Sequence, residues 1–490
     1  MAKLTFIEKK FTQKNLPNWV KNCFPVWALQ TILTFVVCKN AFFWDTVQLA
    51  AWHADFYYEN HFNQFWLPDV MDSGHPPIFG IYIALIWKIL GKSLIASHCA
   101  MLPFLFGIAY QFYRLGQAIM QAGFQTALLP LAVVNPVLWA QSSLVSPDVV
   151  LVFCFLTSIN ALFRKDYKWL IIGTLGLAMT SMRGMMCVCL IFLFDVLRQN
   201  DYSIPYILKK ILPYSVSGLF GILFLGGHYL AKGWIGYFPG SSWAASFEKV
   251  SLFGFCKNLV VISWRLVDFG HLWCWLLLWW IVFLKKRNPI QNDPPFQNAF
   301  AVQQHLIFLL ILAILVLTPT ALIYNNLSAH RYFLPIYLIL NIATIHAVLN
   351  QSWFPKKLYL VLMFSLITGH FWVYPQPIAT GWDATLAHLP YYSMRQEILQ
   401  YLDNQKINTK TVGSGFPNVQ AFRLIDLKNV PQDSAFAAKN FDTNQYIFYS
   451  NIFNDFSEME IHILKHHLGW KPLKILKKGQ IEVILYEKQF

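Results

Sequence analysis

Long apolar runs separated by short polar gaps fill the chain up to residue 375. A hydrocarbon core of about 30 Å is crossed by about 20 helical residues, and eleven of these runs are of about that length. The predicted spans are 23–43, 97–115, 124–145, 147–163, 169–183, 184–198, 207–230, 258–284, 302–324, 332–350 and 358–375. The pattern therefore predicts a polytopic α-helical membrane protein with about eleven transmembrane helices.

The apolar segment 77–91 is predicted not to cross the membrane. It is short, it follows Pro76, and lysines stand at its end, so a helix lying in the membrane interface is favoured. The segment belongs to the stretch 44–96, the predicted first loop between spans. A second interfacial helix is expected to begin after Asp45 in the same loop.

From residue 376 onward, charged and apolar residues alternate and no run is long enough to span a membrane. Helices are expected near 383–403 and 456–468, and strands near 410–414 and 444–450. A hairpin is expected over Ile475–Lys488, turning at Lys478-Gly479. We therefore predict a transmembrane domain over 1–375 and a small soluble α/β domain over 376–490, which handles the acceptor or packs over the membrane site.

The composition agrees with a membrane protein, since 56% of the residues are hydrophobic and 13% are charged. The net charge of +14 comes from Lys and Arg clustered in the gaps between apolar runs. This distribution is typical of membrane topology, and it argues against a nucleic-acid partner. The eight cysteines show neither a disulfide framework nor zinc-ligand spacing.

The basic clusters determine the predicted orientation. If 77–91 does not cross, they all fall on the side of the N-terminus, which has four lysines in its first 14 residues. These clusters are Lys21, Arg114, Arg164-Lys165, Lys168, Arg198, Lys209-Lys210, Lys285-Lys286-Arg287 and Lys356-Lys357. The positive-inside rule then predicts a cytoplasmic N-terminus, retained as a signal anchor, and an extracytoplasmic C-terminal domain. A bacterial inner membrane is favoured, because no retention signal for the endoplasmic reticulum is present.

Two aspartates follow or open predicted spans on the extracytoplasmic side. Asp45 either caps the helix that follows it, with Gln48 completing a capping box, or serves as a site carboxylate. In Ser146-Pro147-Asp148, capping and the helix dipole account for the acid without any substrate. Because both carboxylates are predicted at one membrane face, they can divide the roles of base and of charge or metal organiser.

Cationic and histidine residues are predicted at the same depth. His75, three residues after Asp72, precedes a stiff Pro-Pro pair, and we weigh an ordinary solvated histidine against a group that contacts substrate or metal. Asp72, His330 and Tyr332 are further candidates for such a substrate or metal contact. Arg183 and Arg331, the latter between His330 and Tyr332, are either snorkelling cations or a clamp on a phosphate group.

Arg265, Asp268 and His271 lie three residues apart within one predicted span, so we expect them to share a helix face. The favoured interpretation is a structural ion pair between Arg265 and Asp268 that points into the bundle.

In this order, the motifs resemble those of the polytopic glycosyltransferases of the C superfamily, in particular protein O-mannosyltransferases and lipid A aminoarabinose transferases. The matching positions are Asp45, His75-Pro76-Pro77-Ile78, Pro147-Asp148, Arg183-Gly184 and Arg331-Tyr332-Phe333-Leu334-Pro335, within residues 20–350. Many relatives have Asp-Glu where this chain has Asp45-Thr46. Aminoarabinose transferases favour Glu-Lys-Pro-Pro where this chain has Gly74-His75-Pro76-Pro77.

The resemblance implies a polyprenyl-phosphate-linked sugar as donor, a hydroxyl acceptor on a lipid, glycan or protein, and inversion at the anomeric carbon. It implies Asp45 as the catalytic carboxylate and Asp148 as an organiser of the acceptor or of a divalent cation, Mg²⁺ or Mn²⁺. Arg183 or Arg331 would bind the donor phosphate. A transporter or flippase of a lipid-linked or anionic solute and a glycan ligase are the alternative functions.

Overall fold

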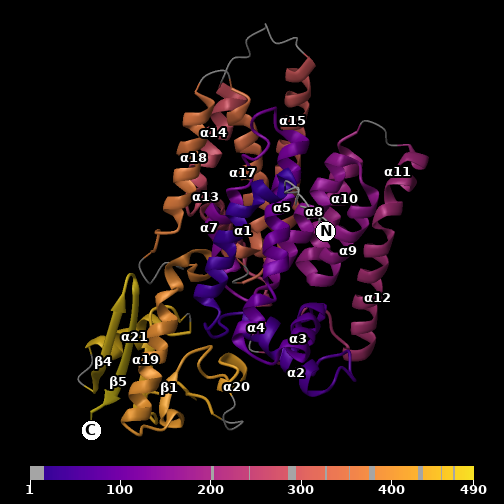
Figure 1. Cartoon of the computed structure of the whole chain (residues 1–490). Coiled ribbons are helices and arrows are strands. Elements are labelled where there is room, and N and C mark those ends of the chain that lie inside the picture. The colour runs from indigo at the N-terminus through magenta and orange to yellow at the C-terminus, as the bar shows by residue number, and fades with distance from the viewer. Residues whose placement is uncertain are drawn as a thin grey trace, which may run out of the picture.

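The computed structural model describes residues 16–199, 203–241, 243–284, 294–325, 328–351, 354–374, 381–428, 434–453, 455–466 and 469–489. A bundle of long helices forms one part, and a smaller part with a β-sheet lies at one end of it (Figure 1). The N-terminal lysines, the basic cluster 285–287 and the predicted domain boundary at 375–376 lie outside the described residues.

The bundle is built from helices of very different lengths. Its longer helices are α1 (Asn18–Val37), α5 (Leu102–Ile119), α8 (Pro147–Arg164), α9 (Tyr167–Thr180), α10 (Met182–Leu197), α12 (Ser215–Lys232), α13 (Leu252–Val267), α15 (Pro294–Leu317), α17 (Leu334–Leu349) and α18 (Pro355–Gly369). Shorter ones are α2 (His53–Glu59), α3 (Ile78–Leu90), α4 (Leu94–Cys99), α6 (Leu131–Val134), α7 (Pro136–Ser142), α11 (Ile204–Ile211), α14 (His271–Trp279) and α16 (Pro319–Ile323).

Six helices of the described residues are long and apolar enough to cross a membrane, or up to seven if a bent pair is one span. They are Asn18–Val37, Leu94–Ile119, Pro147–Arg164, Ile204–Lys232, Ala299–Ile323 and His330–Leu349. The protein is thus a polytopic helical membrane protein. Other predicted spans fall on shorter helices such as α9, α10 and α18, so a total of eleven crossings stays a prediction.

Helix α17 forms the centre of the bundle, because every one of its side chains from Leu334 to Leu349 is buried. It follows directly on the 3₁₀ turn η5 (His330–Phe333), and α14 and α15 pack against it. The turn η5 is therefore anchored by the most buried helix of the bundle. This fixes the position of Arg331 at the end of the bundle.

The predicted continuous span 258–284 is wrong, because the chain bends by 88° between α13 and α14. The bend contains Gly270, whose φ of +86° favours glycine. A Cβ on Gly270 would lie 2.2 Å from the carbonyl oxygen of Ser365, so the close packing on α18 also requires glycine. Asp268 lies in the bend and His271 begins α14, so these residues do not share one helix face with Arg265.

The segment predicted to lie in the interface forms α3, which has 13 residues and does not reach the length of a span. It packs against α2, where the missing side chain of Gly80 allows close contact with His53. Helices α2, α3 and α4 lie together at the end of the bundle that also carries the β-sheet (Figure 1). Their position relative to a membrane stays a prediction.

The C-terminal part contains a mixed five-stranded sheet in the order β2-β1-β3-β5-β4. The strands are β1 (Val412–Ser414), β2 (Ala437–Ala438), β3 (Tyr446–Ser450), β4 (Trp470–Lys478) and β5 (Ile481–Lys488), with helices α19 (Pro390–Asn404), α20 (Phe422–Ile425) and α21 (Glu458–His466). β1 pairs in parallel with β2 and β3, whereas β3, β5 and β4 are antiparallel. The predicted hairpin is confirmed as β4–β5. The first predicted helix begins later than expected, at Pro390, after the 3₁₀ turns η6 (Trp382–Ala384) and η7 (Leu386–His388).

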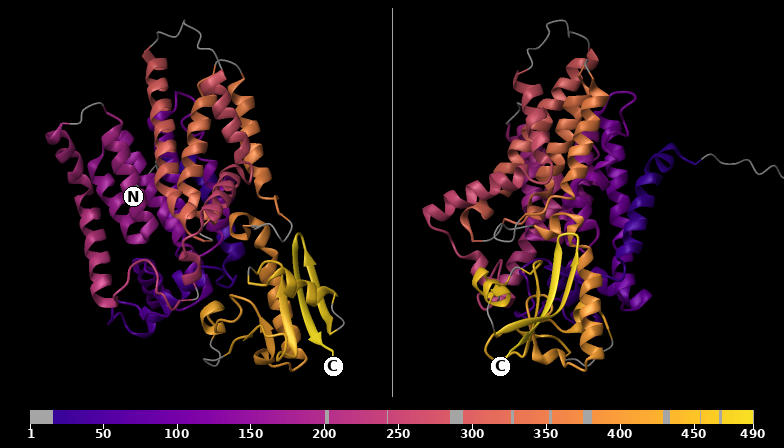
Figure 2. Two further views of the ribbon diagram at one scale, coloured as in Figure 1. Left: turned by 180° about the vertical axis from the view of Figure 1, so that it is seen from behind. Right: turned by 90° about the vertical axis from the view of Figure 1, so that its left-hand side faces the viewer.

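The sheet part and the helical bundle share a hydrophobic core. Phe43 and Trp44, which follow α1, are buried in the same cluster as residues of α19 and of the sheet. The Phe43 ring contacts Tyr391 at 5.0 Å between centroids, and Trp44 contacts His388 at 5.3 Å. In both views of Figure 2 the sheet part lies at one end of the bundle. The chain entering Asp45 is therefore held by the C-terminal part as well as by α1.

Candidate active site

A cavity of about 520 Å³ lies where the bundle meets the C-terminal part. Its walls come from the chain after α1, the loop before α3, the stretch between α12 and α13, the end of α13, the turn η5 and two stretches of the C-terminal part. Its lining includes Trp44, Asp45, Gln48, Asp72, Ser73, His75, Trp243, Ser246, Arg265, His330, Arg331, Tyr332, Trp382, Asp383 and Glu458. A cavity of this size is typical of a small-molecule site.

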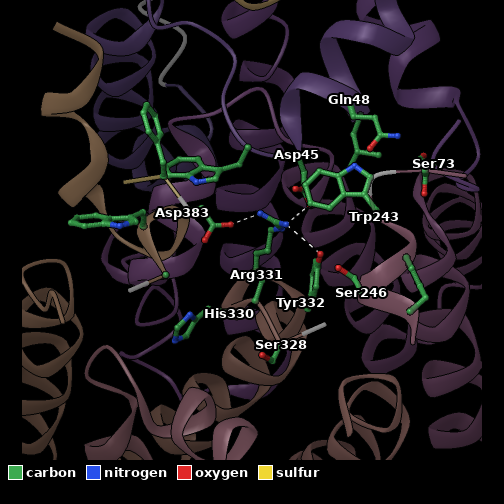
Figure 3. Close-up of a pocket in the computed structure, with 18 of the residues that line it drawn as sticks. Asp45, Gln48, Ser73, Trp243, Ser246, Ser328, His330, Arg331, Tyr332 and Asp383 are labelled. Carbon is green, nitrogen blue, oxygen red and sulfur yellow. Dashed lines mark hydrogen bonds and ion pairs between the residues drawn. The ribbon is translucent and has the colours of Figure 1, made fainter. Parts of the chain in front are cut away.

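Arg331 stands at the centre of the charged wall of the cavity (Figure 3). Its Nη2 donates to Asp45, its Nη1 donates to Asp383, and its Nε lies 3.6 Å from a carboxylate oxygen of Asp148. Arg331 is only 9% exposed, so these charges interact with little screening by water. Three carboxylates from distant parts of the sequence thus converge on one guanidinium.

Asp45 does not act as the helix cap that the sequence allowed. The neighbouring Thr46 makes the local contacts instead, since its hydroxyl accepts from the Phe43 backbone N–H and donates to the Phe43 carbonyl. Trp44 has a φ of +48°, which is rare for a bulky residue and is held by the shared core. Burial raises the pKa of Asp45, Arg331 opposes this rise, and the nearby Asp383 and Asp148 add to it.

Asp148 and Arg183 form an ion pair with an N–O distance of 2.5 Å beside this centre. Asp148 lies in the first turn of α8, which Ser146 caps and Pro147 begins, as the sequence predicts. The Arg183 guanidinium lies over the ring of Tyr332, 4.1 Å from its centroid. Gly184 is required next to it, because a Cβ there would lie 1.9 Å from the Leu177 carbonyl oxygen.

The loop with Asp72 and His75 forms another wall. Asp72 accepts from the Gly74 backbone N–H at 2.8 Å and pairs with buried His228 at 3.1 Å. Burial lowers the pKa of His75 to about 3, helped by the charge of Arg183, so the imidazole is neutral at pH 7. A neutral His75 offers hydrogen bonds but no positive charge.

His330 and Asp268 form a second buried pair, which is separate from Arg331. Nε2 of His330 lies 2.8 Å from Asp268, whose other carboxylate oxygen accepts from the hydroxyl of Tyr374. Nη1 of Arg265 lies 3.4 Å from the same ring nitrogen of His330. The sequence grouped Arg265 with Asp268 and did not predict His330 as a partner of Asp268.

Sequence reasoning missed Asp383 as a site residue. It was interpreted only as the start of a helix in the C-terminal domain, yet its carboxylate reaches Arg331 and its backbone carbonyl accepts from Gln141 of α7. The one available signal was the glycine in Gly381-Trp382-Asp383. In the structure Gly381 has a φ of +58°, a backbone conformation that favours glycine. A link across the 52 residues between Arg331 and Asp383 is not visible in local sequence patterns.

Within the described ranges, no group of three or more His, Cys, Asp or Glu side chains is arranged to hold a metal ion. The three site carboxylates instead surround a guanidinium, which supplies their positive partner. The arrangement combines anionic oxygens able to take a proton with cations able to bind an anion.

Neither protein-family models nor curated protein sequences gave a match to this chain. Among solved structures, it is similar to ArnT from Cupriavidus metallidurans, which was crystallised bound to undecaprenyl phosphate. The TM-score is 0.50 at 10% sequence identity, and the match covers 96% of this chain and 98% of that chain. This similarity confirms the fold that the resemblance to polytopic glycosyltransferases predicted.

Proposed function

We propose that this protein is a membrane glycosyltransferase that moves a sugar from a polyprenyl-phosphate carrier to a hydroxyl acceptor on the extracytoplasmic face. The observation that carries the proposal is the convergence of Asp45, Asp148 and Asp383 on Arg331, which lines the cavity of an ArnT-like fold together with Asp45 and Asp383. The similarity to ArnT supports a lipid-linked donor. The cluster of carboxylates around Arg331 supports proton transfer and anion binding at the cavity.

The donor phosphate is assigned to Arg183 and Arg331. ArnT was crystallised with undecaprenyl phosphate, and this chain brings two guanidiniums together at Tyr332, beside the cavity, where they can form charge-assisted hydrogen bonds with phosphate oxygens. Both lie against the Tyr332 ring, Arg183 at 4.1 Å and Arg331 at 5.0 Å from its centroid. Because Asp383 and Asp45 accept from Nη1 and Nη2 of Arg331 in this structure, we expect an incoming phosphate to compete with them.

In the proposed reaction, the acceptor hydroxyl loses its proton to Asp45 while its oxygen attacks the anomeric carbon. The bond from that carbon to the phosphate oxygen breaks, which inverts the anomeric configuration. The leaving phosphate gains negative charge, and Arg183 and Arg331 stabilise it. The raised pKa of Asp45 suits a residue that must accept a proton near neutral pH.

A transporter or flippase of a lipid-linked or anionic solute is the alternative. Such a protein needs ionisable groups at the middle of the membrane. Here the charges of the site stand at helix starts: Asp148 opens α8, Arg183 opens α10, and Arg331 precedes α17. A glycan ligase shares the proposed chemistry and differs only in the size of the group transferred.

The test incubates the purified protein with short-chain polyprenyl-phosphate sugars and a cell-envelope extract as the source of acceptors. We expect release of polyprenyl phosphate by the wild type and none above background by Asp45→Asn, with equal yield and thermal stability of both proteins. A transporter would release none with either protein. Full activity of Asp45→Asn would remove Asp45 from the mechanism.

A further inference from the structure

One wall of the cavity carries buried polar atoms that have no hydrogen-bond partner among the described residues. Oγ of Ser73 and Nδ1 of His75 are both buried, and neither makes a hydrogen bond within the described part of the chain. Both residues line the cavity. Leaving a buried polar atom unsatisfied costs about 1–3 kcal/mol, so such atoms call for a ligand that supplies hydrogen bonds.

The loop that carries these atoms is held in place on both sides. The carboxylate of Asp72 ties it to His228 of α12, and the two side chains are 4% and 2% exposed. A Cβ on Gly74 would lie 2.5 Å from the carbonyl oxygen of Gly236, so the loop packs backbone to backbone on the segment after α12. The backbone that carries Ser73 and His75 is therefore held in place on both sides of Gly74.

The same segment after α12 supplies an aromatic ring. Trp243 is 38% exposed and lines the cavity, and its ring contacts Phe416 of the C-terminal part edge-on at 5.9 Å. In Figure 3, Trp243, Gln48, Ser73 and Ser246 lie on one side of Arg331, and Asp383 lies on the other. This side of the cavity thus combines an indole with uncharged hydrogen-bonding groups.

We propose that Trp243, Ser73, His75 and Gln48 form the subsite for the pyranose ring of the donor. A pyranose has an apolar C–H face, which packs on an aromatic ring, and hydroxyls around its edge that both donate and accept hydrogen bonds. A neutral imidazole nitrogen, a hydroxyl and an amide match such an edge, whereas a phosphate would need cations. Because the sugar is bonded directly to the phosphate, it must lie next to Arg331 and Asp45, where this wall is found.

This inference rests on the proposed function, and a binding experiment without acceptor tests the two separately. The probes are short-chain polyprenyl phosphate, the same lipid carrying mannose, glucose or aminoarabinose, and the uncharged polyprenol. Wild type, Trp243→Ala, Trp243→Phe and Ser73→Ala are compared. Trp243→Phe is the matched control, because it keeps a flat apolar ring at a partly exposed position that tolerates substitution.

We expect Trp243→Ala to weaken binding of the best sugar-bearing lipid about tenfold and Ser73→Ala about fivefold, while Trp243→Phe stays within about threefold of the wild type. Binding of bare polyprenyl phosphate should stay unchanged in all three variants. An equal loss for both lipids, or no loss in Trp243→Ala, would overturn the sugar subsite but leave the proposed function intact. A wild type that binds polyprenol as tightly as polyprenyl phosphate would overturn both.

Discussion

Asp383 is the site residue whose role follows most directly from its contacts. Its carboxylate accepts from Nη1 of Arg331, and we expect the proposed donor phosphate to compete for the same guanidinium. Replacing Asp383 with Asn keeps the shape and removes the negative charge. We therefore predict that Asp383→Asn binds short-chain polyprenyl phosphate more tightly than the wild type does.

The magnitude follows from the burial of the pair, since Asp383 is 7% exposed and Arg331 is 9% exposed. A hydrogen bond to a charged partner contributes about 1.5–3 kcal/mol and a neutral one about 1 kcal/mol, so the competing interaction weakens by about 0.5–2 kcal/mol. This difference corresponds to a gain of about 2- to 30-fold in affinity. Product release should slow by a similar factor, so turnover should fall although binding improves.

The assay measures the dissociation constant of polyprenyl phosphate at two salt concentrations, together with the thermal midpoint. Glu482→Gln is the matched control, because it removes one negative charge from the same C-terminal part at a residue paired with Lys477, outside the cavity. We expect no change in that variant. Unchanged or weaker binding in Asp383→Asn, with a normal thermal midpoint, would refute the competition between carboxylate and phosphate.

Three further predictions follow from the geometry. Asp45 must be deprotonated to act as a base, and burial raises its pKa. Activity should therefore fall on acidification with a midpoint above the pKa of an ordinary aspartate, and a pH–rate profile measures this midpoint. Arg183→Lys should lower transfer at least tenfold, since it loses the planar group that contacts Asp148 and stacks on Tyr332, and donor KM and kcat are the readouts. Gly270→Ala should destabilise the protein by about 2–4 kcal/mol in thermal unfolding, because the new Cβ meets the backbone of Ser365. Gly91 has the same φ, but a Cβ there would have no atom within 4 Å, so Gly91→Ala should cost only about 1–2 kcal/mol.

Local patterns predicted the parts of the fold that depend on short-range physics. Apolar run length identifies a span such as 147–163, because the hydrocarbon core sets the length and the Ser146-Pro147 cap sets the start. The same reasoning predicted the β4–β5 hairpin from its alternation. It failed at 258–284, where apolar residues continue through a bend that depends on Gly270 packing against the backbone of Ser365.

In the candidate site, too, local patterns identified some residues and missed others. Asp148 and Arg183 were identified because each stands at the start of a helix. The positive-inside rule also predicts both at the extracytoplasmic face. For Asp268, spacing along one predicted helix suggested Arg265 as a partner, and this ion pair stays a prediction. The fold also brings His330 from another segment to 2.8 Å from the carboxylate, which no local pattern indicated. Asp383 was missed for a related reason, since its role depends on how the C-terminal part docks.

The docking of the C-terminal part therefore bears on the chemistry and not only on stability. Trp44 packs in the core of that part and directly precedes Asp45, while Trp382 lies in the same core and directly precedes Asp383. Two of the three carboxylates on Arg331 are thus positioned by one hydrophobic cluster, and the third, Asp148, lies in the first turn of α8 in the bundle. A shift of the C-terminal part would move Asp45 and Asp383 together relative to Arg331. The C-terminal part therefore helps to set the spacing of the acidic groups around Arg331.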